Sequence, residues 1–328
     1  MVILWVLVIA SILVVVSKEV IYSEPLVKAA QSGYAEAQFD LGLCFERGEG
    51  TEINYIEAAK WYQLSANQGH AKAQESLGDC YAYGIGYKKD MEQAAKWYSL
   101  AAEQGEKESQ YMLGDCYYSG EGVTQDVVEA TKWYRMAAEQ GHETAQYLLG
   151  VCYDIGEGVK VDNSEAVKWY TLAAKQGIGE AQLGLAGLYA EGRGVQQDTK
   201  KALFYFQKAA MQGIVEAQYV LGMFYSEDTK DKDYKKAVKW LRYAANQGHA
   251  DSQFELGKCY TNGSGVTIDY QKAYYWFLLS DINGNRPANY HKQIISRKLD
   301  DNNRNRIERR IDDLVENYEP GSVIFTKT

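Results

Sequence analysis

The sequence predicts an all-α solenoid of about seven helical repeats, each 36 residues long. Three observations predict this fold: a tryptophan column, an Ala-Gln or Ser-Gln column and a Leu-Gly column recur in step. Self-similarity at a period of about 20–50 residues is typical of repeat proteins, whose units pack on their neighbours. The copies cover roughly residues 35–70, 71–106, 107–142, 143–178, 179–214, 215–249 and 250–285.

The tryptophan column shows the period most directly. Its members are Trp61, Trp97, Trp133, Trp169, Tyr205, Trp240 and Trp276. The glutamine column runs through Gln38, Gln74, Gln110, Gln146, Gln182, Gln218 and Gln253. The leucine column runs through Leu41, Leu77, Leu113, Leu149, Leu185, Leu221 and Leu256. Three columns that stay in step over seven copies exclude a chance pattern.

Each copy is expected to form two helices joined by a loop. In copy two, Leu77 and Tyr81 lie four residues apart on one face of a first helix at about 71–83. Gly84 and Gly86 then end that helix and turn the chain, because glycine tolerates positive φ. An Asp or Asn follows and is expected to cap the second helix, whose first N–H groups lack partners. These caps are Asn54, Asp90, Asp126, Asp162, Asp198, Asp233 and Asp269.

Copy six is the irregular copy. Its loop, 226–232, has lost both glycines and one residue. We expect a different loop path here but an intact repeat.

The repeated pattern A-x-A-Q-x-x-L-G-x-x-Y-x-x-G-x-G-V-x-x-D-x-x-x-A-x-x-W-Y closely resembles the Sel1-like repeat, a relative of the tetratricopeptide repeat. Copy three matches it almost position for position from Ser109 to Tyr134, and the resemblance covers about residues 35–285. The resemblance implies a right-handed α/α superhelical solenoid whose concave face is lined by the first helices. It also implies an adaptor or scaffold, since members of this family act mostly in those roles.

The two ends of the chain differ from the repeats. Residues 2–16 are almost wholly apolar and would span about 23 Å as a helix, less than the roughly 30 Å of a bilayer core. No basic residue precedes this run and no clean cleavage site follows it, so three interpretations stay open: an uncleaved anchor, a cleaved signal, or a packed helix or mis-assigned start. We expect a signal or anchor at 1–20, an N-terminal cap at 21–34, and a helical cap with a tail at 286–328. A membrane-anchored or secreted protein with an extracytoplasmic body follows from the first two interpretations.

The charge of the chain limits the class of partner. A net charge of −9 argues against nucleic acid, which needs a basic surface. Residues 286–310 hold eight Lys or Arg and three Asp or Glu, so this segment is locally basic. It is expected to be a solvated helix face, or else a contact for lipid or an acidic partner.

No catalytic, cofactor or metal site is expected. The cysteines Cys44, Cys80, Cys116, Cys152 and Cys259 share one column. Packed neighbours lie about 8–10 Å apart, whereas a disulfide needs Cα atoms within about 7 Å, so buried free thiols are expected. Three histidines each follow a glycine at a helix end: His70, His142 and His249. A cationic side chain there is expected to interact favourably with the C-terminal end of the helix dipole. The alternative function is a β-lactam-binding, β-lactam-hydrolysing or cell-wall-associated protein of the cysteine-rich Sel1-like branch, but this chain lacks the second cysteine per repeat found there.

A partner is expected to bind where the copies vary. The positions equivalent to Glu36, Asp40, Leu43 and Arg47 form one stripe along each first helix. This stripe is apolar in the middle copies and polar toward both ends, which is typical of a protein-binding surface. The predicted partner-binding residues are Tyr83, Met112, Asp115, Leu148, Val151, Ile155 and Met223.

The stripe is interrupted in copy five. Gly184 and Gly187 are expected to leave a gap without side chains in copy five. The alternative interpretation of the stripe is that it packs against a neighbouring helix and belongs to the core. We expect a monomer that binds a protein or peptide ligand.

Overall fold

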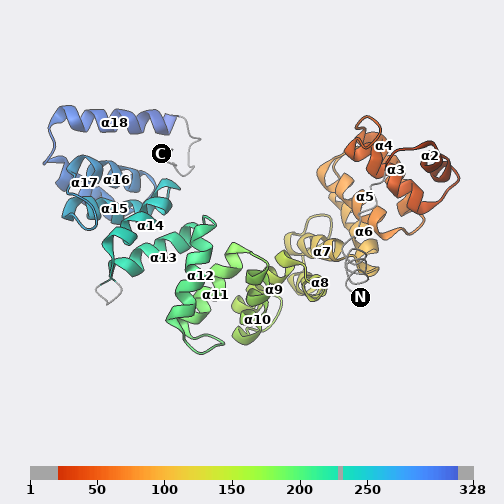
Figure 1. Ribbon diagram of the computed structural model, residues 1–328, viewed down its shortest axis with the longest axis horizontal. Helices are drawn as coiled ribbons and strands as arrows, with labels where there is room; N and C mark the ends of the chain where they lie inside the picture. Colours follow the sequence, from red (N-terminus) through yellow and green to blue (C-terminus); the bar gives the residue numbers. More distant parts are fainter. Residues whose placement is uncertain (1–20, 228–231, 317–328) are drawn as a thin grey trace, which may run out of the picture. The chain divides into compact units, whose positions relative to one another are not determined.

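The computed structural model describes residues 21–227 and 232–316, with side chains up to Asp313. Every regular element in this part is an α-helix, and no strand occurs within it (Figure 1). The helices are α2 (Glu24–Gln31), α3 (Ala35–Arg47), α4 (Tyr55–Ala66), α5 (Ala71–Tyr83), α6 (Met91–Glu103), α7 (Lys107–Ser119), α8 (Val127–Glu139), α9 (Glu143–Ile155), α10 (Asn163–Lys175), α11 (Gly179–Glu191), α12 (Thr199–Met211), α13 (Val215–Ser226), α14 (Tyr234–Asn246), α15 (Ala250–Asn262), α16 (Tyr270–Ile282), α17 (Arg286–Ser296) and α18 (Asp301–Glu316). The predicted all-α repeat fold is confirmed.

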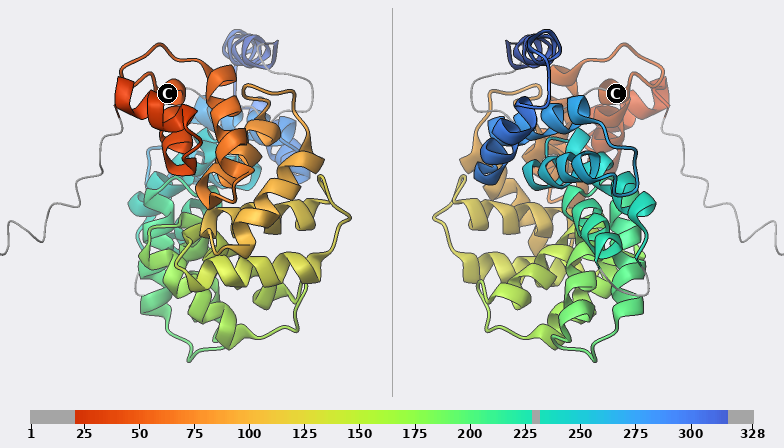
Figure 2. Two further views of the ribbon diagram at one scale, coloured as in Figure 1. Left: turned by 90° about the vertical axis from the view of Figure 1, so that its right-hand side faces the viewer. Right: turned by 90° about the vertical axis from the view of Figure 1, so that its left-hand side faces the viewer.

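The chain divides into two compact units, residues 1–160 and 161–328. Unit 1 holds α2 to α9, and unit 2 holds α10 to α18. Within each unit a first helix packs against the second helix that follows it, and this second helix packs against the next first helix (Figure 2). In unit 2 the last second helix, α16, also packs against α17 and α18. Each repeat is therefore stabilised mainly by its sequence neighbours.

The predicted caps of the second helices are confirmed. In all seven copies the Asp or Asn side chain accepts a backbone N–H from the first turn of the helix. Asp126, for example, accepts from Val128 and Glu129 at 3.0 Å each. These carboxylates and amides satisfy N–H groups that have no partner inside the helix.

The glutamine column joins three helices. Gln110 Nε2 donates to the Ala102 carbonyl at the end of α6 at 3.1 Å. Its Oε1 accepts from Gln140 Nε2, just after α8, at 2.9 Å. The same pair of bonds recurs around Gln38, Gln74, Gln182, Gln218 and Gln253. A buried amide thus adds a second hydrogen bond to a helix-end carbonyl, which also accepts the N–H of the following glycine, and links one repeat to the next.

Glycine is required where two chain segments approach closely. A Cβ on Gly114 in α7 would lie 2.7 Å from the ring of Tyr134 in α8. Gly122 in the following loop has φ +78°, and a Cβ there would collide with the Met91 carbonyl of the preceding second helix. The glycine of the Leu-Gly column therefore lets the two helices of one repeat pack closely. The loop glycine lets the loop pack closely against the preceding repeat.

The core consists of small residues, one leucine column and a few large aromatic residues. Leu77, Leu113 and Leu149 are at most 2% exposed, and so are Tyr62, Tyr98 and Tyr134 of the second helices. Each cluster combines residues of two successive repeats, as around Ala58, Tyr62 and Leu77. No single repeat can bury its apolar face alone, which explains why the copies occur in tandem.

Copy six keeps its helix pair. Helix α13 ends at Ser226, and the following Glu227 is extended with ψ 150°, whereas the other loops begin with a left-handed glycine. Helix α14 still begins at Tyr234 after the Asp233 cap. The predicted change of path is confirmed where the loop begins, and residues 228–231 lie outside the described residues.

The predicted signal or anchor at 1–20 also lies outside the described residues. Among the helices of 21–227 and 232–316, none combines the length and the apolar character needed to cross a membrane. Helix α2 precedes the first repeat, and α17 and α18 follow the last one.

Candidate functional site

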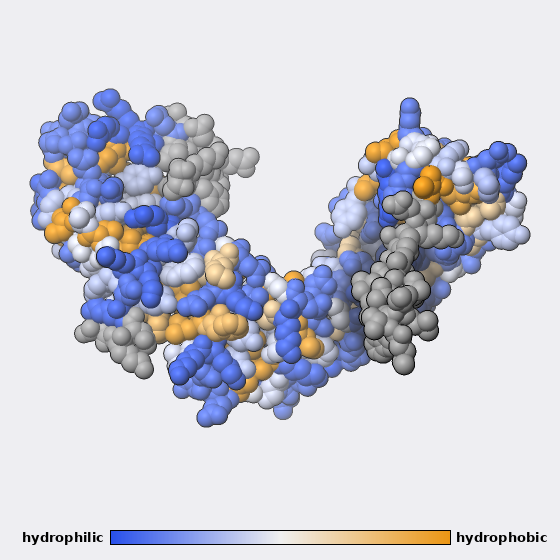
Figure 3. All heavy atoms as spheres, viewed as in Figure 1, coloured by the Kyte–Doolittle hydropathy of each residue, from blue (hydrophilic) through white to orange (hydrophobic). Residues whose placement is uncertain are grey.

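The predicted partner-binding residues all lie on the surface side of first helices. Six belong to unit 1: Tyr83 on α5, Met112 and Asp115 on α7, and Leu148, Val151 and Ile155 on α9. Tyr83 and Ile155 are 64% and 61% exposed, and the other members of the set, Met223 included, are half-buried. Exposed hydrophobic residues form small separate patches on a mostly hydrophilic surface (Figure 3). No member of the set is buried in the core.

Tyr83 of α5 lies within electrostatic range of Asp115 of α7 in unit 1. Partial burial and the carboxylates of Asp79, Glu108 and Asp115 raise the pKa of the Tyr83 hydroxyl. Helices α5 and α7 thus present a tyrosine beside three carboxylates. This arrangement can accept hydrogen bonds or a positive charge from a ligand.

Asp115 has a structural partner as well as an exposed side. Its Oδ1 accepts a hydrogen bond of 2.7 Å from the hydroxyl of Tyr134 in α8. Asp79 accepts the equivalent bond from Tyr98 at 2.7 Å. This pairing is not among the sequence-based predictions, although each tyrosine follows its aspartate by 19 residues in both copies. These carboxylates are therefore held in fixed orientations by buried tyrosines.

The apolar members of the set contact the core from outside. Met112 packs against the cluster around Tyr98 and Leu113, and Leu148 packs against the cluster around Tyr134. Only their outer surface is available to a partner. The binding-surface interpretation of the stripe therefore suits the exposed Tyr83 and Ile155. Met112 and Leu148 also pack against the core, as the alternative interpretation expects.

Met223 lies in unit 2, in a largely apolar cavity of about 270 Å³. Leu203 and Phe206 of α12 and Tyr219 of α13 line the same cavity. The cavity that Met223 lines is therefore formed by residues of copies five and six.

The predicted gap in copy five is only half correct. A Cβ on Gly187 would meet nothing within 4 Å, so this position is open. A Cβ on Gly184 would lie 2.9 Å from the ring of Tyr170. The aromatic ring of the preceding second helix occupies the space that the missing side chain leaves.

The first helices of unit 1 are acidic. Helices α3, α5, α7 and α9 carry nine Asp or Glu and three Lys or Arg. Burial raises the pKa of Asp79, and the nearby carboxylates of Glu108 and Glu46 add to this shift. Burial likewise raises the pKa of Glu75. Because burial is the main cause of both shifts, the acidic character of this face rests on its nine carboxyl side chains against three basic ones.

The cysteines are buried free thiols, as predicted. Burial raises the pKa of Cys80 to about 12 and those of Cys116 and Cys259 to about 11. A nucleophilic or metal-binding cysteine needs the thiolate form, which these environments disfavour. The column therefore serves as small core residues.

The prediction for the histidines is wrong in one respect. His70, His142 and His249 do not act at the C-terminus of the preceding helix; each is the N-cap of the next first helix. The Nδ1 atom of His142 accepts the Ala145 N–H at 3.1 Å, and its Nε2 lies 3.1 Å from Glu108. The turn between helices is so short that one residue ends it and begins the next helix.

Within residues 21–227 and 232–316, no group of three or more His, Cys, Asp or Glu could hold a metal ion. The glycine loops join helix to helix, without the preceding strand that a nucleotide loop requires.

Paired helices that repeat every 36 residues and pack on their neighbours define an α-solenoid repeat protein. The Sel1 repeat model matches residues 35–70, 71–106, 107–142, 144–178, 179–214, 215–249 and 250–280. The chain therefore belongs to the Sel1 repeat family, and the resemblance identified from the columns is confirmed. Repeats of this kind generally mediate interactions between proteins.

Solved structures support the same assignment. The chain is similar to a Sel1 repeat protein from Oxalobacter formigenes, with 33% identity over 82% of this chain and 78% of that chain and a TM-score of 0.66. It is also similar to c5321, a protective antigen present in uropathogenic Escherichia coli strains, with 26% identity, 92% and 83% coverage and a TM-score of 0.60. No curated protein matches the chain.

Proposed function

We propose that the protein is a non-enzymatic scaffold that binds a segment of a partner protein in the groove lined by its first helices. The binding region is the first-helix face of unit 1, defined here as the exposed and half-buried side chains of α3, α5, α7 and α9. The observation that carries this proposal is the exposure of Tyr83 and Ile155 on first helices that hold nine acidic and three basic side chains.

The charge of this face favours a partner segment with both basic and apolar side chains. Lysine or arginine from the partner would meet Asp79, Glu108 and Asp115 around the Tyr83 hydroxyl. An apolar residue would cover Ile155 and the outer surface of Leu148. Apolar contact at the centre with charged groups around it is the usual composition of a protein interface.

A scaffold role agrees with the chemistry of the columns. The cysteines are buried, the histidines cap helices, and the aspartates before the second helices bind backbone N–H groups. These three repeat columns of the described residues therefore have framework roles, which supports a scaffold.

A membrane tether or an export signal at residues 2–16 forms a further part of the proposal. The almost wholly apolar character of this run, broken only by Ser11, supports it. N-terminal sequencing of the protein from its own cell distinguishes the alternatives: an intact start in the membrane fraction indicates an anchor, and a shortened start indicates a cleaved signal. An intact, extractable protein would contradict both.

Site-specific photocrosslinking tests the proposed face. A photoreactive phenylalanine analogue at position 83 or 155 should give a discrete crosslinked product in the native cell. The matched controls are Leu64 and Met136 on second helices of the same unit, which are 46% and 43% exposed. Equal crosslinking from all four positions would show that the contact is nonspecific.

Binding to the partner identified in this way completes the test. The substitution Ile155→Asp should weaken the affinity at least about tenfold, equivalent to about 1.4 kcal/mol, because it adds a charge to the proposed apolar contact. Met136→Asp should leave the affinity unchanged, and both variants should melt at the temperature of the parent. Unchanged binding by Ile155→Asp would reject the proposed face.

A further inference from the structure

A second surface, on second helices of unit 2, carries charge of the opposite sign. Helices α12 and α14 contain seven Lys or Arg and no Asp or Glu. These residues are Lys200, Lys201, Lys208, Lys235, Lys236, Lys239 and Arg242. In a chain with a net charge of −9, such a local excess of positive charge needs a specific explanation.

Part of this excess arises at one position of the repeat. In copies one, three and four, the third residue of the second helix is a glutamate that pairs with the lysine three residues later. The pairs are Glu57–Lys60 at 2.6 Å, Glu129–Lys132 at 2.6 Å and Glu165–Lys168 at 3.0 Å. In copies five to seven the third residue is a lysine: Lys201, Lys236 or Lys272. An acidic partner is thus replaced by a cation in three successive copies.

The substituted lysines lie over aromatic rings of the first helices. Lys201 lies 5.0 Å from the ring centre of Tyr189, Lys236 lies 5.3 Å from Tyr225, and Lys272 lies 5.4 Å from Tyr260. Lys236 and Lys272 also approach the capping carboxylates of Asp233 and Asp269 at 3.3 Å. Those carboxylates already bind backbone N–H groups, so they offset the positive charge only in part.

One groove occurs in both units with different side chains. In unit 2 it lies between α14 and the loop before α16, has a volume of about 440 Å³, and is lined by Lys235, Lys239 and Arg242. The equivalent groove of unit 1, between α6 and the loop before α8, has Glu92, Lys96 and Ser99 at these positions. The framework therefore builds the groove, and copy six makes it basic.

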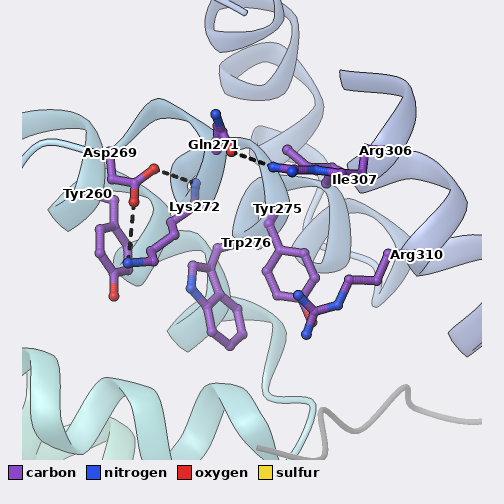
Figure 4. Close-up of a pocket in the computed structure, with 9 residues that line it drawn as sticks. All are labelled: Tyr260, Asp269, Gln271, Lys272, Tyr275, Trp276, Arg306, Ile307 and Arg310. Atoms are coloured by element: carbon purple, nitrogen blue, oxygen red, sulfur yellow. Dashed lines mark hydrogen bonds and ion pairs between the residues drawn. The ribbon is translucent and has the colours of Figure 1, made fainter. Parts of the chain in front are cut away.

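A larger cavity lies one repeat further along unit 2, between α16 and α18 (Figure 4). It has a volume of about 590 Å³. Arg306 and Arg310 of α18 line one wall, and Tyr275 and Trp276 of α16 line the opposite wall. Arg306 donates to the Gln271 amide oxygen at 2.9 Å, and Arg310 lies 5.4 Å from the ring centre of Tyr275.

A hydrogen bond joins the linings of the two recesses. Arg242 of the groove donates a hydrogen bond of 2.9 Å to the hydroxyl of Tyr260, which lines the larger cavity. No described carboxylate forms an ion pair with Lys239, Arg242, Arg306 or Arg310. Guanidinium groups without a carboxylate partner, set beside aromatic walls, suit a ligand with carboxylates and an apolar or aromatic side chain.

We propose that this basic–aromatic surface, formed by Lys235, Lys239, Arg242, Lys272, Arg306 and Arg310, binds an acidic segment of a partner protein. Carboxylates of the segment meet the cations of the groove, and an aromatic or apolar side chain enters the cavity beside Trp276. An extended segment fits better than a flat membrane, because the cations line two recesses on consecutive repeats. This surface is separate from the first-helix face of unit 1, and the proposal does not rest on that one.

Fluorescence anisotropy with defined peptides tests the proposal. The probe is a fluorescein-labelled peptide of four Glu-Glu-Tyr units, and the control is the same peptide with glutamine in place of glutamate. The full chain should bind the acidic probe in a salt-sensitive manner and the neutral control at least about tenfold more weakly. Equal binding of both peptides would overturn the proposal.

The repeat itself supplies matched variants. The double substitution K235E/R242S copies the side chains of the equivalent groove in copy two, and it should reduce the affinity for the acidic probe at least about tenfold. The variant R306Q/R310Q should also weaken binding. The reverse exchange E92K/S99R in unit 1 should create a second site and raise the stoichiometry. All three variants should keep the circular dichroism spectrum of the parent.

Three further results would contradict the proposal. Preferential binding to phosphatidylserine vesicles that the acidic peptide cannot displace would identify a lipid surface as the occupant. Concentration-dependent association abolished by K235E/R242S would identify a second copy of this chain. Peptide binding that appears only after removal of residues 317–328 would identify the chain's own terminal segment.

Discussion

At the residue scale, several side chains of the first-helix face combine a framework contact with an exposed side. Asp79 and Asp115 each accept a hydrogen bond from a buried tyrosine of the second helix. The tyrosine fixes the carboxylate, and the carboxylate satisfies a hydroxyl that would otherwise lie unpaired near the core. A carboxylate held in this way can meet a partner cation without first losing rotational freedom.

Replacing Asp79 with asparagine tests this dual role through pH. Burial raises the pKa of Asp79, so the folded protein binds this proton more tightly than the unfolded chain does. This group therefore costs stability above its raised pKa, and the cost disappears as pH falls through that pKa toward the ordinary value of 3.8. Asp79→Asn keeps an acceptor for Tyr98 and should be at least as stable as the parent at pH 7. The advantage should shrink toward pH 4 in urea unfolding curves; an advantage that grows in acid would contradict the assigned environment.

At the element scale, the glycine column determines how closely the two helices of a repeat approach. Gly114→Ala places a methyl group against the ring of Tyr134, which is 2% exposed and cannot move outward without disturbing the core. We expect a loss of about 1–3 kcal/mol, as for other overpacked sites. Gly187→Ala is the matched control, because the space around that position is open and alanine favours a helix by up to about 1 kcal/mol over glycine. Chemical denaturation of both variants should give changes of opposite sign, and a stable Gly114→Ala variant would show that the helix pair is loosely packed.

The helical elements could be predicted from the sequence because their signals are local and repeated. The Asp126 column, for example, marks the start of each second helix through a cap that involves only its own first turn. The predicted role of His142 at a helix C-terminus is wrong, because the sequence places this residue equally near a helix end and a helix start. The stripe residues lie on the outer side of the first helices, and their binding of a partner stays a prediction. The partial burial of Met112 and Leu148 depends on the rotation of each helix against its neighbour. Long-range contacts of this kind leave no periodic signal in a single helix.

At the scale of the whole molecule, the net charge of −9 conceals two local excesses of opposite sign. The first helices of unit 1 carry nine acidic and three basic side chains. Helices α12 and α14 of unit 2 carry seven basic side chains and no acidic one. Net charge therefore excludes a uniformly basic surface but not a specific acidic ligand. A repeat framework permits this division, because each copy can vary its exposed positions while its core columns stay constant.

The tandem arrangement predicts that one whole copy can be removed. Deleting residues 107–142 joins Glu106 to Glu143 and lets α9 pack on α6 in place of α7. The core columns of the two helices agree, since Leu113, Gly114 and Cys116 are replaced by Leu149, Gly150 and Cys152. The shortened chain should keep the same helical ellipticity per residue and lose about 2–5 kcal/mol of unfolding free energy, in proportion to 36 residues. Deleting only 107–124 is the control: it leaves α8 without its first helix and exposes Tyr134, so this chain should lose helix content and aggregate on size-exclusion chromatography. If both deletions behaved alike, stability would not be shared between neighbouring repeats in the way the packing implies.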